Sequence, residues 1–262
     1  MISNLFDILK IVGSVALFIY STILLTKGVQ KAAGNELRKI LATVTSNRFF
    51  GVFAGFLVTI MVQSSSATSV MVVSYVNSGI ITLAQSIGVV MGTNIGTTST
   101  GWLLSVLGFE LNIIEYVLPI AALSVPFLFA ARGSLRAVSD IFNGFALMFV
   151  SFYMLSLTLP TLATYEGFLQ YITFFQNPGI FSTFLFVLCG TVLTLLCRSS
   201  SAAMAITMVA AFQGWLSFEA AAGIILGENI GTTVTANLAA QGGSTNARRT
   251  AFAHFLFNVF GI

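Results

Sequence analysis

The sequence predicts an all-α, polytopic membrane protein with two inverted repeats, each a re-entrant helical hairpin followed by a broken transmembrane helix. Three observations support this fold class. First, 56% of the 262 residues are hydrophobic and only 7% are charged, whereas a soluble domain carries about 25% charged residues. Second, the apolar segments are long enough to cross about 30 Å of hydrocarbon. Third, two polar motifs occur twice in the same order, so we expect a single multi-pass domain over residues 1–262 in the cell membrane.

The repeat is visible when residues 55–103 are laid over residues 190–238, which align without a gap. The sequence "SSSA" at 64–67 matches 199–202, and "G-x-N-I-G-T-T" at 92–98 matches 227–233. Two separated polar motifs at one spacing indicate a duplication. We place repeat 1 at about 49–159 and repeat 2 at about 180–262.

The first motif predicts the hairpin. Residues 49–62 and 67–76 are apolar runs too short to span the membrane, since a spanning helix needs about 20 residues, and the sequence "QSSS" lies between them. A hairpin that enters and leaves on one side, with the serines at its tip, accounts for this pattern. Residues 179–213 predict a second hairpin.

The second motif predicts the broken helix. Residues 82–107 have the length of a full crossing, but Gly92, Gly96 and two threonines interrupt them, and glycine permits non-helical backbone. Irregular backbone at membrane depth must be buried in protein or line a cavity. Helix N-termini there suit an anion, and hydroxyl, amide and carbonyl oxygens suit a sodium ion.

The count of crossings gives the inversion. Residues 5–26 form a retained first helix, and three crossings follow the first hairpin, at 82–107, 112–131 and 135–159. The second hairpin then opens on the other side, a pattern typical of secondary transporters. Nine of the eleven basic residues fall on one side in this count, which we expect to be cytoplasmic.

The same alignment makes a prediction about the end of the chain. The counterpart of the helix at 112–131 would begin near Ala247, and that of the helix at 135–159 beyond Ile262. We therefore expect this sequence to be a C-terminally truncated part of a longer protein. In the short form, a homodimer would cover the unpaired apolar face.

The motifs "VQSSSATS" with "GTNIGTT", and "RSSSAAM" with "GENIGTT", resemble the type II sodium/phosphate cotransporter family. The segments "KGVQKAAGNELRKIL" and "AFAHFLFNVFGI" extend the resemblance over most of the chain. It implies sodium-coupled transport of inorganic phosphate by alternating access, with phosphate, sodium and the bilayer as partners. It implies no nucleic acid, no enzymatic activity, and no cofactor besides sodium as the coupling ion.

The resemblance also implies that the paired serine tips and the paired helix breaks converge on one midplane site. The candidate phosphate ligands are Ser64, Ser65, Ser66, Ser199, Ser200 and Ser201. The candidate sodium or mixed ligands are Gln63, Asn94, Thr97, Thr98, Asn229, Thr232 and Thr233.

One position departs from the family pattern. Arg198 precedes the second serine motif where the family has glutamine, and Glu228 takes the place that Thr93 has in repeat 1. An arginine at membrane depth needs a partner, and Glu228 is the one we expect. The pair is either purely structural, or Arg198 binds phosphate while Glu228 holds it or contributes to cation coordination.

The same residues bear on other functions. Another small oxyanion, a passive channel and a regulatory membrane scaffold stay open as alternatives. A serine hydrolase would need a general base beside each serine cluster, and the single histidine, His254, cannot serve both; we expect it to be a satisfied packing residue. The glycine motif lacks the lysine and the spacing of a nucleotide-binding loop.

Overall fold

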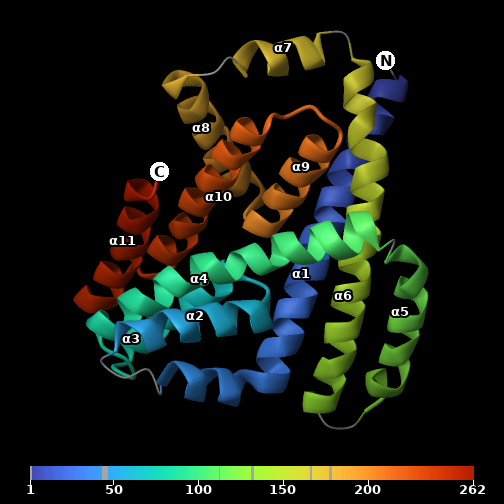
Figure 1. Cartoon of the computed structure of the whole chain (residues 1–262). Helices are drawn as coiled ribbons and strands as arrows, with labels where there is room; N and C mark the ends of the chain where they lie inside the picture. The colour runs from blue at the N-terminus through green and yellow to red at the C-terminus, as the bar shows by residue number, and fades with distance from the viewer. Residues whose placement is uncertain (1, 43–46, 112, 131–132, 166, 177–178) are drawn as a thin grey trace.

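The computed structural model describes all residues except 1, 43–46, 112, 131–132, 166 and 177–178. The described residues form helices and turns without a β-strand (Figure 1), which confirms the all-α prediction. The helices are α1 (Ile2–Ala42), α2 (Arg48–Val62), α3 (Ser65–Asn77), α4 (Leu83–Leu103), α5 (Ile114–Leu128), α6 (Gly133–Thr158), α7 (Phe168–Phe175), α8 (Ile180–Cys197), α9 (Ser200–Phe212), α10 (Phe218–Ala239) and α11 (Thr245–Phe260). A π-helical segment, Leu104–Glu110, extends α4, and a 3-10 segment, Leu159–Thr164, extends α6.

Three stretches of helix are long and apolar enough to cross a membrane, at Leu5–Ala42, Gly133–Thr164 and Ile180–Cys197. A fourth candidate span is the bent pair of Leu83–Glu110 with Ile114–Leu128. These spans agree with the predicted polytopic membrane protein. The predicted helix at 112–131 has both of its end residues outside the described part of the chain, and α5 occupies its interior.

The first helix is longer than the sequence pattern predicts. It continues past residue 26 to Ala42 because the following lysine, alanine, glutamate, leucine and arginine residues are good helix formers. Figure 1 shows that its last part turns aside and runs beneath α2. There Leu37 and Leu41 are fully buried against α2 residues that include Val58 and Val62, so this extension belongs to the core.

The two repeats fold into equivalent units of hairpin plus long helix. The bounds of α3 and α9 are 135 residues apart, and α4 and α10 begin with the same spacing. The hairpin turns and their serine caps also match. The structure thus confirms the duplication and the helical hairpins. The inversion of the repeats across the membrane and the re-entry of the hairpins stay predictions.

The predicted break in the long helices is wrong. Both α4 and α10 run as continuous helix through the glycine motif. Their glycines serve close packing instead: a Cβ on Gly92 would collide with the Val52 carbonyl oxygen, and one on Gly227 with the Val187 carbonyl oxygen. Small residues at four-residue spacing let two membrane helices approach backbone to backbone, so α4 lies directly against α2 and α10 against α8.

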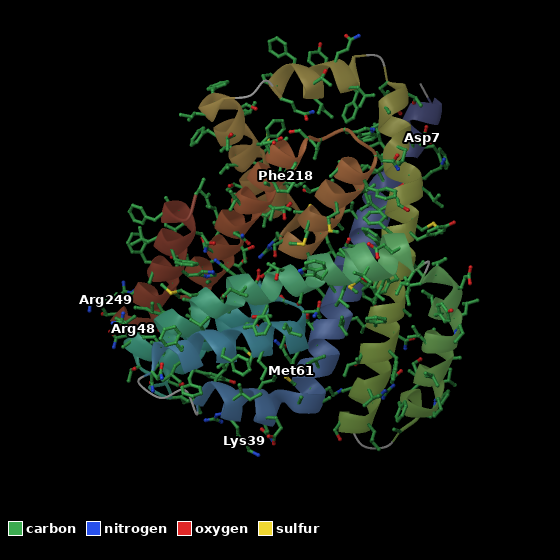
Figure 2. All side chains as sticks on the ribbon, viewed as in Figure 1. Asp7, Lys39, Arg48, Met61, Phe218 and Arg249 are labelled. Carbon is green, nitrogen blue, oxygen red and sulfur yellow. The ribbon has the colours of Figure 1, made fainter. Side chains whose placement is uncertain are left out.

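The labelled charged side chains lie at different edges of the molecule. Figure 2 shows Lys39 at the bottom of the view, Arg48 and Arg249 at its left edge, and Asp7 at the upper right, near the start of α1. The clustering of basic residues on one membrane side stays a prediction. That this side is cytoplasmic stays a prediction.

Candidate functional site

Each hairpin reverses direction at a single residue with left-handed backbone. Gln63 ends α2 with φ 53° and ψ 31°, and Arg198 ends α8 with φ 52° and ψ 24°. The next residue is an extended serine that caps the following helix: Ser64 Oγ accepts a hydrogen bond from Ala67 N at 3.2 Å, and Ser199 Oγ makes the equivalent bond. Each tip thus presents hydroxyls and the first turn of a helix, where backbone N–H groups lack intrahelical partners.

The two tips meet at one cavity of about 510 Å³. Five of the six predicted serines line it, and the sixth, Ser65, is buried beside it. The cavity residues from the two hairpins and α10 are Gln63, Ser64, Ser66, Ala67, Val70, Met71, Arg198, Ser199, Ser200, Ser201 and Thr235. The structure therefore brings together the two serine motifs, which are 135 residues apart in the sequence.

The third wall of the cavity comes from α1, which the sequence analysis did not include in the site. Its contributors are Ile19, Thr22, Ile23, Thr26, Lys27 and Gln30. The sequence does carry a signal for them, because Thr22, Thr26 and Gln30 recur every four residues and so form a polar stripe on one face of an apolar helix.

The structure does not bring the asparagine and threonine motifs to this cavity, and their roles as sodium ligands stay predictions. None of their residues lines it. Because α4 and α10 stay helical, their hydroxyls bond to carbonyls one turn earlier: Thr97 to Thr93 O at 2.9 Å and Thr232 to Glu228 O at 2.9 Å. Thr233 bonds to a carbonyl in the same way. Thr98 is exposed and lines separate hollows beside Trp102.

Gln63 connects the cavity to α4. Its Oε1 accepts a hydrogen bond from the Thr100 hydroxyl at 3.1 Å, and its Nε2 donates to Ser99 Oγ at 3.4 Å. It also lines the neighbouring hollow on the α4 side. Of the predicted sodium ligands, Gln63 is thus the one placed in contact with both the cavity and α4.

The expected ion pair between Arg198 and Glu228 is also wrong. Arg198 is exposed and faces the cavity from the hairpin tip, whereas Glu228 is 1% exposed on α10. The Thr207 hydroxyl of α9 donates to Glu228 Oε1 at 2.8 Å, and Glu228 Oε2 has no hydrogen-bond partner. No salt bridge joins the two residues in the described part of the chain, so each makes its own contacts.

Asn94 belongs to a buried network that the sequence did not reveal. Its Oδ1 lies 3.1 Å from His254 Nε2, and its Nδ2 donates to Asn258 Oδ1 at 2.6 Å. His254 is fully buried, and its Nδ1 lies 3.5 Å from Ser69 Oγ. The prediction of a satisfied packing histidine is confirmed. By contrast, Asn229 makes no side-chain hydrogen bond within the described part of the chain.

Comparison with known proteins connects these features to a family. The family model described as Na+/Pi-cotransporter matches residues 17–157 and 179–262. The uncharacterized protein YqeW of Bacillus subtilis is 31% identical over 242 residues, covering 91% of this chain and 75% of YqeW. YjbB of Escherichia coli K12, named as a candidate inorganic phosphate export protein, is 26% identical over 97% of this chain.

A mammalian relative matches a shorter part. The sodium-dependent phosphate transport protein 2A of Rattus norvegicus is 33% identical over 107 residues, or 40% of this chain and 17% of that protein. The chain spans only 45% of YjbB, and no solved structure matches it. The family model covers both hairpins and both long helices. The chain therefore belongs to the Na+/Pi-cotransporter family.

Proposed function

We propose that this protein is a secondary transporter that carries inorganic phosphate across the cell membrane together with sodium ions, by alternating access to the cavity between the two hairpin tips. The observation that supports this most directly is the composition of that cavity. Serines from both repeats and Arg198 line it. Hydroxyl groups, helix N-termini and a cation are the donors that a tetrahedral oxyanion accepts best.

The charge of the cavity favours an anion over other substrates. No aspartate or glutamate is among its lining residues in the described part of the chain, while Lys27 and Arg198 both are. No histidine lines it either in the described part of the chain, so its serines have no imidazole to act as the general base of nucleophilic catalysis. Binding and release of an anion is the chemistry that this set of side chains supports.

Sodium coupling is proposed through Gln63 and Glu228. Gln63 Oε1 lies at the contact of the first tip with α4, and amide and carboxylate oxygens are suitable ligands for a hard cation. Glu228 offers a buried carboxylate oxygen with no partner, and a buried charge calls for a compensating cation. The roles of Asn94, Asn229 and the motif threonines as sodium ligands, and a homodimer in the membrane, stay predictions.

Uptake by purified protein in liposomes tests this function. Labelled phosphate should accumulate under an inward sodium gradient and should not do so when potassium or a proton gradient replaces it. The same vesicles loaded with phosphate should lose it when the sodium gradient is reversed, which would relate this chain to the export named for YjbB. Uptake that is unsaturable and independent of sodium would indicate a channel, and stronger competition by sulfate than by phosphate would indicate another oxyanion.

A further inference from the structure

One face of α1 is turned toward the hairpin tips. The six α1 residues that line the cavity follow the pattern i, i+3, i+4, i+7, i+8 and i+11 along the helix, and such positions share one side of a helix. Two contacts fix the orientation of α1 about its own axis. The Thr26 hydroxyl donates to Val62 O, at the end of α2, at 3.0 Å. Gly28 lies so close to α6 that a Cβ there would come within 2.9 Å of Ile141.

Lys27 lies between these two anchors and lines the cavity. A lysine that follows an apolar run usually reaches for the membrane interface with its flexible stem. Here the residues on either side of Lys27 are fixed, because Thr26 bonds to the first hairpin and Gly28 packs against α6. Lys27 therefore lines the same cavity as Arg198.

The two cations come from different parts of the fold. Lys27 is on α1, and Arg198 is at the tip of the second hairpin. No aspartate or glutamate in the described part of the chain lines the cavity beside them. In the described part of the chain, the ion pairs of lysines lie away from the cavity: Lys10 pairs with Asp7, and Lys39 pairs with Glu36. Two like charges that share a cavity without a counter-charge are best compensated by an anion between them.

We propose that Lys27 is a substrate-binding residue, which together with Arg198 holds the oxyanion between α1 and the hairpin tips. This inference rests on the proposed function and adds α1 to the binding site. The serine hydroxyls give short directional bonds, while Lys27 supplies a mobile point charge. Because Lys27 is exposed, its contribution should be screened by salt.

The first test is the kinetics of phosphate uptake at saturating sodium. Lys27→Gln should raise the KM for phosphate about fivefold, which is the upper range for an exposed charge pair, and leave the maximal rate nearly unchanged. Lys27→Arg should restore most of the affinity. Lys31→Gln is the matched control, since Lys31 lies one turn further along α1 and lines a different hollow; its KM should equal that of the wild type.

The second test separates charge from structure. Raising the ionic strength with choline chloride at fixed sodium should raise the KM of the wild type more than that of Lys27→Gln. In Lys27→Cys, a cationic methanethiosulfonate reagent should restore affinity and an anionic one should lower it further. The wild type treated in the same way gives the background from Cys189 and Cys197, which are both free thiols.

The outcomes distinguish the two levels of the hypothesis. If the wild type does not transport phosphate, the proposed function fails. If it does, and Lys27→Gln keeps the wild-type KM and salt dependence, Lys27 does not bind substrate and this inference is overturned. Loss of uptake in Lys27→Gln that neither arginine nor the cationic reagent restores would also overturn it, because the residue would then act through structure.

Discussion

Replacing Arg198 with glycine should raise the stability of the protein and lower its affinity for phosphate. Arg198 has left-handed backbone, with φ 52° and ψ 24°, which costs a residue other than glycine about 1 to 2 kcal/mol. Glycine removes this cost and is the usual residue just after a helix, but its freedom in the unfolded chain offsets about 0.5 to 1 kcal/mol. We therefore expect the free energy of unfolding to rise by about 0.5 to 1 kcal/mol.

The same change removes a guanidinium from the cavity. A charge-assisted hydrogen bond contributes about 1.5 to 3 kcal/mol when protected from water, but Arg198 is exposed, so we take about 1 kcal/mol. That corresponds to about a fivefold higher KM for phosphate. Stability and affinity should thus change in opposite directions in one variant.

Two further variants separate strain from charge. Arg198→Gln keeps the side chain in the left-handed turn without the charge, so affinity should fall while stability stays constant. Arg198→Lys keeps the charge, so both should stay near the wild type. Thermal unfolding in detergent and uptake by liposomes measure the two quantities. A lower stability for Arg198→Gly would contradict the strain argument, and an unchanged KM in both neutral variants would exclude Arg198 from phosphate binding.

Four other substitutions test separate parts of the structure. Gly92→Ala would push a methyl group into the Val52 carbonyl and should lower the free energy of unfolding by about 1 to 3 kcal/mol. Gly34 has open space around it, so Gly34→Ala should raise the free energy of unfolding by up to about 1 kcal/mol; thermal unfolding measures both. Glu228→Gln keeps the shape of a buried side chain without its charge, so stability should hold or rise while the sodium concentration for half-maximal uptake increases; an unchanged sodium requirement would remove Glu228 from coupling. Thr98→Val lies outside the cavity and should leave the KM for phosphate unchanged, whereas a raised sodium requirement would retain Thr98 as a sodium ligand.

The hairpins could be predicted because duplication gives independent support to a local pattern. A serine motif between two short apolar runs is ambiguous when it occurs once, since membrane serines often only bond to neighbouring helices. Two copies with the same spacing predict a shared structure, and the structure has matching left-handed turns at Gln63 and Arg198. The meeting of the two tips in one cavity agrees with the convergence that the family resemblance implies for the serines.

The continuous course of α4 could not be predicted from its glycines. Glycine lowers helix propensity by about 1 kcal/mol, but it also allows helices to touch backbone to backbone. Which effect decides depends on whether another helix lies alongside, and a sequence does not show this. In α4 the neighbour is α2, whose carbonyls occupy the space that a side chain at Gly92 would fill, so packing compensates the weak propensity.

The largest failure of symmetry lies in the asparagine motifs, which differ in sequence only at Thr93 and Glu228 but whose asparagines make different contacts. Asn94 is bonded to His254 and Asn258 because α11 packs against α4 and α3. The helix at the equivalent place in repeat 1, α5, packs against α6, and Asn229 is left without a hydrogen bond in the described part of the chain. Next to Asn229, Glu228 brings a buried carboxylate with an unpartnered oxygen. The duplicated sequence thus forms two matching hairpin tips, where we propose that the anion binds, and two helix motifs with different contacts. Of these two motifs, the one with the buried Glu228 carboxylate is where we expect a cation to bind.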